Sequence, residues 1–146
     1  MTTIRSILLA EDSPADAEMA IDALRDANLA NPIVHVQDGV ETLDFLLARG
    51  KYAGREGGDP AVLLLDIKMP RVDGLEVLQE LRAHERLRRL PVVMLTSSRE
   101  ESDLARSWDL GVNAYVVKPV DIDQFFQAVK TLGTFWAVIN ETPVGD

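Results

Sequence analysis

Apolar residues gather in five short runs along the chain, and amphipathic segments separate these runs. Each run has four or five residues, is rich in Val, Ile and Leu, and shows no alternation with polar residues. Such runs are typical of strands that are buried on both faces of a parallel sheet. The pattern therefore predicts five strands, over residues 7–10, 33–36, 61–65, 92–95 and 114–117.

A helix-start signal follows each of the five runs. In every case a Ser or Asp that can cap a helix precedes an acid or an amide by three residues. Five strands that alternate with five helices predict an α/β fold, a doubly wound (βα)5 chain with helices on both faces of the sheet. The capping pairs are Ser13/Asp16, Asp38/Glu41, Asp73/Glu76, Ser98/Glu101 and Asp121/Gln124.

Composition and charge narrow the class of protein. The 146 residues carry 15 Lys and Arg against 24 Asp and Glu, for a net charge of -9. We expect a single domain over residues 1–146, with its core in 4–139 and no output domain. The negative charge argues against direct binding to nucleic acid or to an anionic membrane, because both need clustered basic residues. With no signal segment or membrane-spanning run, we expect a cytoplasmic protein.

Polar residues directly follow four of the five predicted strands. Ligands of open parallel sheets bind beyond the carboxyl ends of the strands, at the point where the strand order reverses. The second strand is followed only by an ordinary helix cap, which places it at an edge and predicts the strand order 2-1-3-4-5. The polar residues are Glu11 and Asp12 after the first strand, Asp66 after the third, Thr96 after the fourth and Lys118 after the fifth.

These residue types together favour phosphoryl-transfer chemistry. Three carboxylates that converge repel one another and therefore need a cation. Carboxylates with water suit Mg²⁺ or Mn²⁺, while the absence of Cys and the scarcity of His count against zinc. A lysine, a hydroxyl group and a divalent cation around one aspartate can spread the charge of a transferring phosphoryl group, and the aspartate is the natural nucleophile.

The order of these motifs resembles that of CheY-like receiver domains in two-component response regulators. The resemblance covers residues 6 to about 132. It implies the five-stranded, flavodoxin-like receiver fold and a phosphorylated switch protein that is not an enzyme, although it autophosphorylates and autodephosphorylates. The motifs that carry it are Glu11-Asp12, LLDIKMP at 64–70, Asp73-Gly74, Thr96-Ser97-Ser98 and Val117-Lys118-Pro119.

The resemblance implies a role for each residue of the acidic cluster. Asp66 would accept a phosphoryl group from a sensor histidine kinase. Asp12, Asp66 and the backbone carbonyl of Lys68 would bind Mg²⁺ or Mn²⁺, with Glu11 acting mainly through water.

The resemblance also implies a switch. Thr96 and Lys118 would contact the phosphoryl oxygens, and Tyr115 matches the aromatic residue whose rotamer follows the switch. A plain strand aromatic remains the alternative for Tyr115. Ser97 is a departure, because many receivers carry Ala after the threonine.

Two features are similar to single-domain regulators that pair with bacterial phytochrome histidine kinases. These are the loop over residues 50–60 and the aromatic ending with Phe135 and Trp136. The resemblance implies a bacteriophytochrome as the partner kinase.

Aromatic residues are frequent in the last third of the chain, among them Trp108, Tyr115, Phe126, Phe135 and Trp136. The fifth helix can bury only one stripe of side chains, so some of these aromatics should face outward. We therefore expect a homodimer through the fourth helix, fifth strand and fifth helix, the surface that would also carry the signal. A lid over the core is the alternative for Phe135 and Trp136.

Two other functions compete with a phosphorylated switch. An aspartate-nucleophile phosphatase similar to the haloacid dehalogenase group needs a second acid two residues after the nucleophile, where this chain has Lys68. A phosphate-independent assembly scaffold is the other, and such receivers usually lack part of the acidic cluster that this chain keeps.

Overall fold

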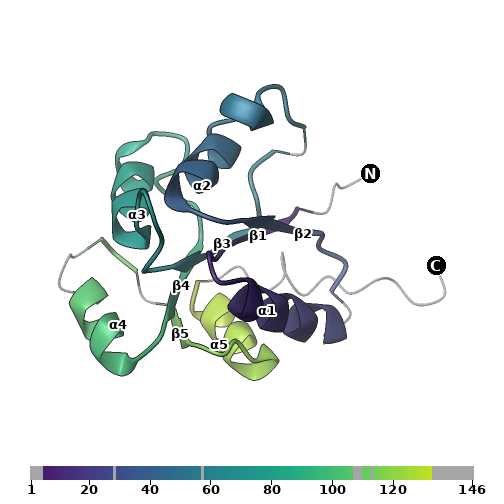
Figure 1. Cartoon of the computed structure of the whole chain (residues 1–146), viewed down its shortest axis with the longest axis vertical. Coiled ribbons are helices and arrows are strands. Elements are labelled where there is room, and N and C mark those ends of the chain that lie inside the picture. Colours follow the sequence, from purple (N-terminus) through teal and green to yellow (C-terminus); the bar gives the residue numbers. More distant parts are fainter. Residues whose placement is uncertain (1–4, 28, 57, 107–109, 113, 133–146) are drawn as a thin grey trace.

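The elements of the computed structural model follow the predicted alternation of strands and helices (Figure 1). The structure describes residues 5–27, 29–56, 58–106, 110–112 and 114–132. Each predicted strand is confirmed to within one residue at either end. The elements are β1 (Ile7–Ala10), α1 (Pro14–Asp26), β2 (Ile33–Val36), α2 (Gly39–Leu46), the 3-10 turn η1 (Gly50–Tyr52), β3 (Val62–Asp66), α3 (Gly74–Ala83), β4 (Val92–Thr96), α4 (Arg99–Arg106), β5 (Tyr115–Val117) and α5 (Ile122–Leu132).

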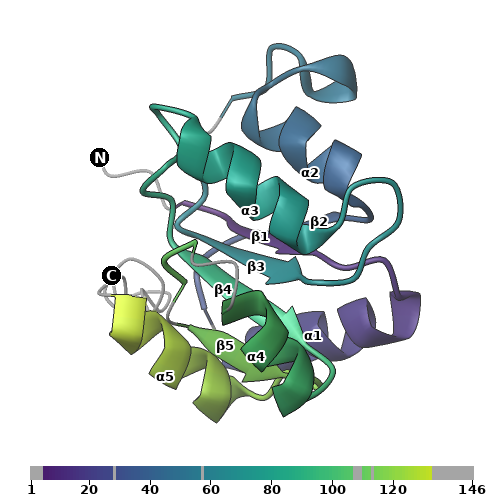
Figure 2. The same cartoon turned by 90° about the vertical axis from the view of Figure 1, so that its left-hand side faces the viewer.

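The five strands form one parallel sheet in the predicted order β2-β1-β3-β4-β5. Helices α1 and α5 cover one face, and α2, α3 and α4 cover the other (Figures 1 and 2). Side chains of β1 alternate between the two faces, since Leu8 belongs to one buried cluster while Ile7 and Leu9 belong to the other. Both clusters are apolar, which explains why the strands show no polar alternation.

All five predicted capping pairs form, each with a backbone N–H of the first helical turn bonded to the capping side chain. The caps fix where each helix begins after its strand, and so they shape the loops at the carboxyl edge of the sheet. The donor–acceptor distances are 3.3 Å for Asp16 to Ser13, 2.7 Å for Glu41 to Asp38, 2.9 Å for Glu76 to Asp73, 3.2 Å for Glu101 to Ser98 and 2.8 Å for Gln124 to Asp121.

Helix α5 buries Phe125 and Val129 completely, and Phe126 is half-buried against the same cluster. The predicted continuation of this helix face, with Phe135 and Trp136, lies outside the described residues, and so does Trp108. Among the helices that the structure describes, none has the length and apolar character needed to cross a bilayer.

The expected loop over residues 50–60 begins with η1 and is tied to the helices beside it. The Arg55 guanidinium lies 4.1 Å from the centre of the Phe45 ring. Arg86 forms an ion pair with Asp59 and donates a hydrogen bond of 2.8 Å to the carbonyl of Leu46. The loop is therefore a structured addition to the α2–α3 side of the fold.

Gly74 is a position where the fold leaves no room for a side chain. A Cβ atom there would lie 2.2 Å from the carbonyl oxygen of Asp66, and the Gly74 N–H donates a 2.7 Å hydrogen bond to the Ile67 carbonyl. We predict that Gly74→Ala lowers the free energy of unfolding by about 1–3 kcal/mol, because backbone must move to relieve the overlap. Urea unfolding checks this, with Gln79→Ala on the exposed side of α3 as the control. Equal stability of the two variants would contradict the prediction.

Candidate functional site

The carboxyl ends of the strands bring the predicted polar residues to one edge of the sheet. Glu11 and Asp12 follow β1, Asp66 ends β3, Thr96 ends β4 and Lys118 follows β5. Glu11, Asp66 and Thr96 are at most 2% exposed, whereas Asp12 faces solvent. The site is thus a partly buried acidic pocket with one accessible carboxylate at its rim.

Lys118 is at the centre of this pocket. Its Nζ lies 3.1 Å from Glu11 Oε2, 3.2 Å from Asp66 Oδ2 and 3.2 Å from Asp16 Oδ2. An ammonium has three donors, so each one has a carboxylate partner. Asp16 was expected only as part of a helix-start signal. One sequence feature pointed to Asp16: it is an acid in the first turn of the helix that follows an acidic strand end.

The carboxylates of Glu11, Asp12 and Asp66 are close enough to share one cation. Each offers an oxygen, and these oxygens all lie within 4.8 Å of one another. Burial, followed by the charge of Glu11, raises the pKa of Asp66 from 3.8 to about 7, and Lys118 offsets only part of this increase. Asp66 is hard to ionise and lies beside two further acids. A divalent cation bound among the three would stabilise their ionised forms. The donor set therefore fits a divalent metal site.

The same carboxylates act on Lys118. Burial by itself lowers the pKa of Lys118, but Asp66, Glu11 and Asp16 outweigh burial and raise the pKa above its ordinary value. Lys118 therefore stays protonated and charged at neutral pH.

Glu11 is held in place by protein groups on all sides. Its Oε1 accepts a hydrogen bond of 3.1 Å from the Ser13 N–H, and its Oε2 contacts Lys118. Its backbone carbonyl lies 2.8 Å from His35 Nε2, and its N–H donates to the Val36 carbonyl at 3.1 Å. With both carboxylate oxygens engaged, Glu11 is the most constrained acid of the pocket.

A third buried acid, Glu101, connects the loops after β3 and β4 to α4. Glu101 is 7% exposed, and its two oxygens accept hydrogen bonds of 3.0 Å each from the N–H and the hydroxyl of Ser97. Lys68 Nζ lies 3.4 Å from Glu101 Oε2, so this exposed side chain is paired with α4. Sequence analysis identified Glu101 only as a capping residue and missed these contacts.

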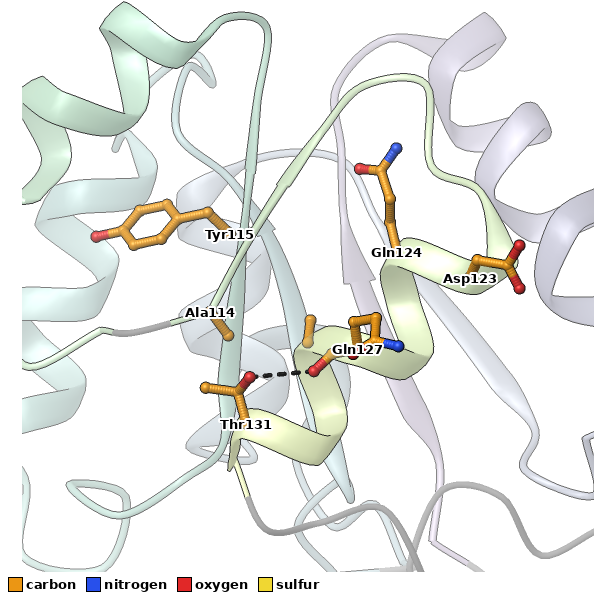
Figure 3. A pocket seen from close by; sticks show the side chains of 7 residues that line it. Ala114, Tyr115, Asp123, Gln124, Gln127 and Thr131 are labelled. Atoms are coloured by element: carbon orange, nitrogen blue, oxygen red, sulfur yellow. Dashed lines mark hydrogen bonds between the residues drawn. The ribbon is translucent and has the colours of Figure 1, made fainter.

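Tyr115 lies away from the acidic pocket, on β5. Its half-buried side chain packs against the apolar cluster on the α2–α3–α4 side of the sheet. With Ala114 it forms one wall of a pocket of about 370 Å³, and residues 123–131 of α5 form the other. In Figure 3 the Tyr115 ring points away from the side chains of α5.

The raised pKa of Asp66 makes stability depend on pH when metal is absent. Folded Asp66 keeps its proton to about pH 7, whereas an unfolded carboxyl loses it near pH 4, so the unfolded chain binds fewer protons and stability falls as pH rises between these values. Asp66→Asn removes this loss of stability, because the asparagine side chain does not ionise. In a buffer with chelator we predict that Asp66→Asn raises Tm by a few degrees at pH 8 and by less at pH 5. Asp123→Asn, an exposed carboxyl on α5, is the control, and an equal gain at both pH values would contradict the prediction.

Comparison with known proteins agrees with this geometry. The model of the response regulator receiver domain matches residues 7–130. Response regulator Rcp1 of Synechocystis sp. is 35% identical over 130 residues, which are 89% of this chain and 87% of that protein. The Mn²⁺-bound structure of Rcp1 has a TM-score of 0.71, with 32% identity over 97% of this chain and 99% of that one.

Two solved structures are more similar. The bacteriophytochrome response regulator AtBRR has 58% identity and a TM-score of 0.92, over 96% of this chain and 100% of that chain. The bacteriophytochrome response regulator RtBRR has 54% identity and a TM-score of 0.88, over 97% of this chain and 86% of that chain. The chain therefore belongs to the response regulator receiver domain family.

Proposed function

We propose that this chain is a stand-alone two-component response regulator that accepts a phosphoryl group on Asp66. The observation that carries the proposal is the contact of buried Asp66 with Lys118 beside a cluster of acids that fits a divalent cation. The family match supports it, and the relatives that the chain spans almost end to end support a regulator built from the receiver domain alone. The chain would act in the cytoplasm with a sensor histidine kinase as its partner, and the names of AtBRR and RtBRR favour a bacteriophytochrome.

The acidic residues would hold Mg²⁺ or Mn²⁺. Asp12 and Asp66, with the backbone carbonyl of Lys68, would be the ligands, and Glu11 would act mainly through water because its oxygens are already bonded to Ser13 and Lys118. The cation would supply positive charge that stabilises the phosphoryl oxygens. The Mn²⁺ in the Rcp1 structure supports this choice of metal.

In the transfer, an oxygen of ionised Asp66 attacks the phosphorus of a phosphohistidine. A new P–O bond forms, the P–N bond breaks, and the imidazole leaves with the bond's electron pair. Lys118 and Thr96 would contact the phosphoryl oxygens as the phosphoryl group is transferred to Asp66. Attack by water on the acyl phosphate later releases inorganic phosphate and restores Asp66, so the chain undergoes covalent turnover without being an enzyme for an external substrate.

The signal would leave the site through β4, β5 and α4. Thr96 and Tyr115 would be the switch residues, since β4 and β5 pair from Met94–Tyr115 to Thr96–Val117. A shift of the loop after Thr96 would also move Glu101, because Glu101 is bonded to Ser97. The changed surface would be that of α4, β5 and α5.

Phosphorylation of Asp66 is directly testable. With Mg²⁺ and acetyl phosphate, we predict a base-labile acyl phosphate on the parent chain and none on Asp66→Asn. Mass spectrometry and hydroxylamine sensitivity measure the modification. Asp123→Asn, which removes an exposed carboxyl that is not a partner of Lys118, should be labelled like the parent. A label that persists in Asp66→Asn would overturn the proposal.

The α4–β5–α5 surface would also form a homodimer. Val117 on β5 is 40% exposed, one of two exposed large apolar residues in the part of the chain that the structure describes, and two-fold pairing would cover it. We predict a dimer by sedimentation at micromolar concentration, and a shift toward monomer in the double variant Phe135→Ala/Trp136→Ala. Met19→Ala, which removes an exposed apolar side chain on α1, is the control and should leave the dimer intact. A monomer in both the phosphorylated and unphosphorylated protein would contradict this.

A further inference from the structure

Asp16 differs from the other two partners of Lys118 in position and exposure. Glu11 and Asp66 belong to the strand ends and are 1% and 2% exposed. Asp16 comes from the first turn of α1, and its side chain is 38% exposed. Its carboxylate is not part of the cluster that could share a cation. Asp16 therefore reaches the site only through its 3.2 Å contact with Lys118.

The geometry of Lys118 sets a condition on phosphorylation. All three donors of the ammonium are engaged before any phosphoryl group arrives. A direct bond from Lys118 to a phosphoryl oxygen therefore requires that one carboxylate gives up its bond.

Asp16 is the partner that can be released most easily. Removal of Lys118 from Glu11 would leave a buried carboxylate without its counter-charge, which is strongly destabilising. Asp66 is the acceptor itself and lies under the transferred group. Released Asp16 would be hydrated by the solvent it already faces, and an exposed ion pair contributes little.

We propose that Asp16 is a positioning residue that aims Lys118 into the pocket in the resting state and is exchanged for a phosphoryl oxygen on transfer. The proposal rests on the proposed function of Asp66. The exchange is non-covalent: the Lys118–Asp16 bond is lost and a Lys118–phosphoryl bond is gained. The covalent step is unchanged, with a P–O bond formed at Asp66 while the bond from phosphorus to the donor breaks.

The test compares Asp16→Ala and Asp16→Asn with Glu18→Ala. Glu18 lies on the same helix, is exposed, and is not a partner of Lys118, so its removal makes the same change in net charge. Beryllofluoride with saturating Mg²⁺ serves as a non-covalent phosphoryl analogue, and calorimetry measures its affinity. The initial rate of labelling by acetyl phosphate is the second readout, and thermal unfolding checks that each variant folds.

Release of Lys118 from Asp16 should favour the phosphoryl-bound state. We expect Asp16→Ala to bind beryllofluoride about two- to fivefold more tightly than the parent, the range spanned by an exposed ion pair. Glu18→Ala should stay close to the parent, and Mg²⁺ affinity should not separate the two variants. Asp16→Asn keeps the shape of the side chain, so it carries the test if the alanine variant unfolds.

Three results would overturn the exchange: unchanged affinity in the Asp16 variants, weaker binding in them, or an equal gain in Glu18→Ala. The last would mean that net charge alone acts on the anion. A parent chain that takes neither beryllofluoride nor the acyl phosphate label would instead overturn the function proposed for Asp66. The two failures are therefore distinguishable.

Discussion

The carboxyl edge of the sheet depends on the charge of Lys118. Without this ammonium, Glu11 and Asp66 would be two buried acids facing each other, and a buried charge that loses its partner costs about 3–5 kcal/mol. Lys118 also joins the strand ends of β1, β3 and β5 to the first turn of α1. One side chain thus neutralises part of the pocket and fixes the relative positions of its walls, while leaving enough negative charge to attract a divalent cation.

The sheet supports this concentration of charge because the layers beneath the site are apolar and buried. The central strands are buried on both faces, so the acids at their ends cannot retreat into the core or rearrange. Close backbone approach at Gly74 fixes the carbonyl of Asp66 from the α3 side. Lys118 offsets part of the repulsion between the acids, and a bound cation or proton would offset the rest.

The strands and the helix starts could be predicted because each depends on local sequence, and the strand order followed from which strand ends carry polar residues. A run such as residues 62–66 is stable only where both of its faces are buried, and a capping pair lies within one helical turn. The contact of Asp16 with Lys118 could not be predicted, because it joins residues 102 positions apart through the tertiary fold. Likewise, Phe125 and Phe126 both fit an apolar helix face, and only the packed structure decides that Phe125 is the fully buried one.

Asp16 and Glu101, which the sequence predicted only as partners of helix caps, occupy the same place in their helices. Asp16 in α1 and Glu101 in α4 each stand three residues after the capping serine, and each donates its N–H to that serine. At this position a side chain points back toward the carboxyl edge of the sheet, so it can contact the site as well as begin the helix.

Asp16 and Glu101 differ in exposure, and this difference determines what each can do. Asp16 makes one contact that water can replace, which allows it to release Lys118. Glu101 is buried and is bonded twice to Ser97, so it must move together with the loop after Thr96. Under the proposed function, a carboxylate of the first kind would set how readily the site changes, whereas one of the second kind would transmit that change to α4.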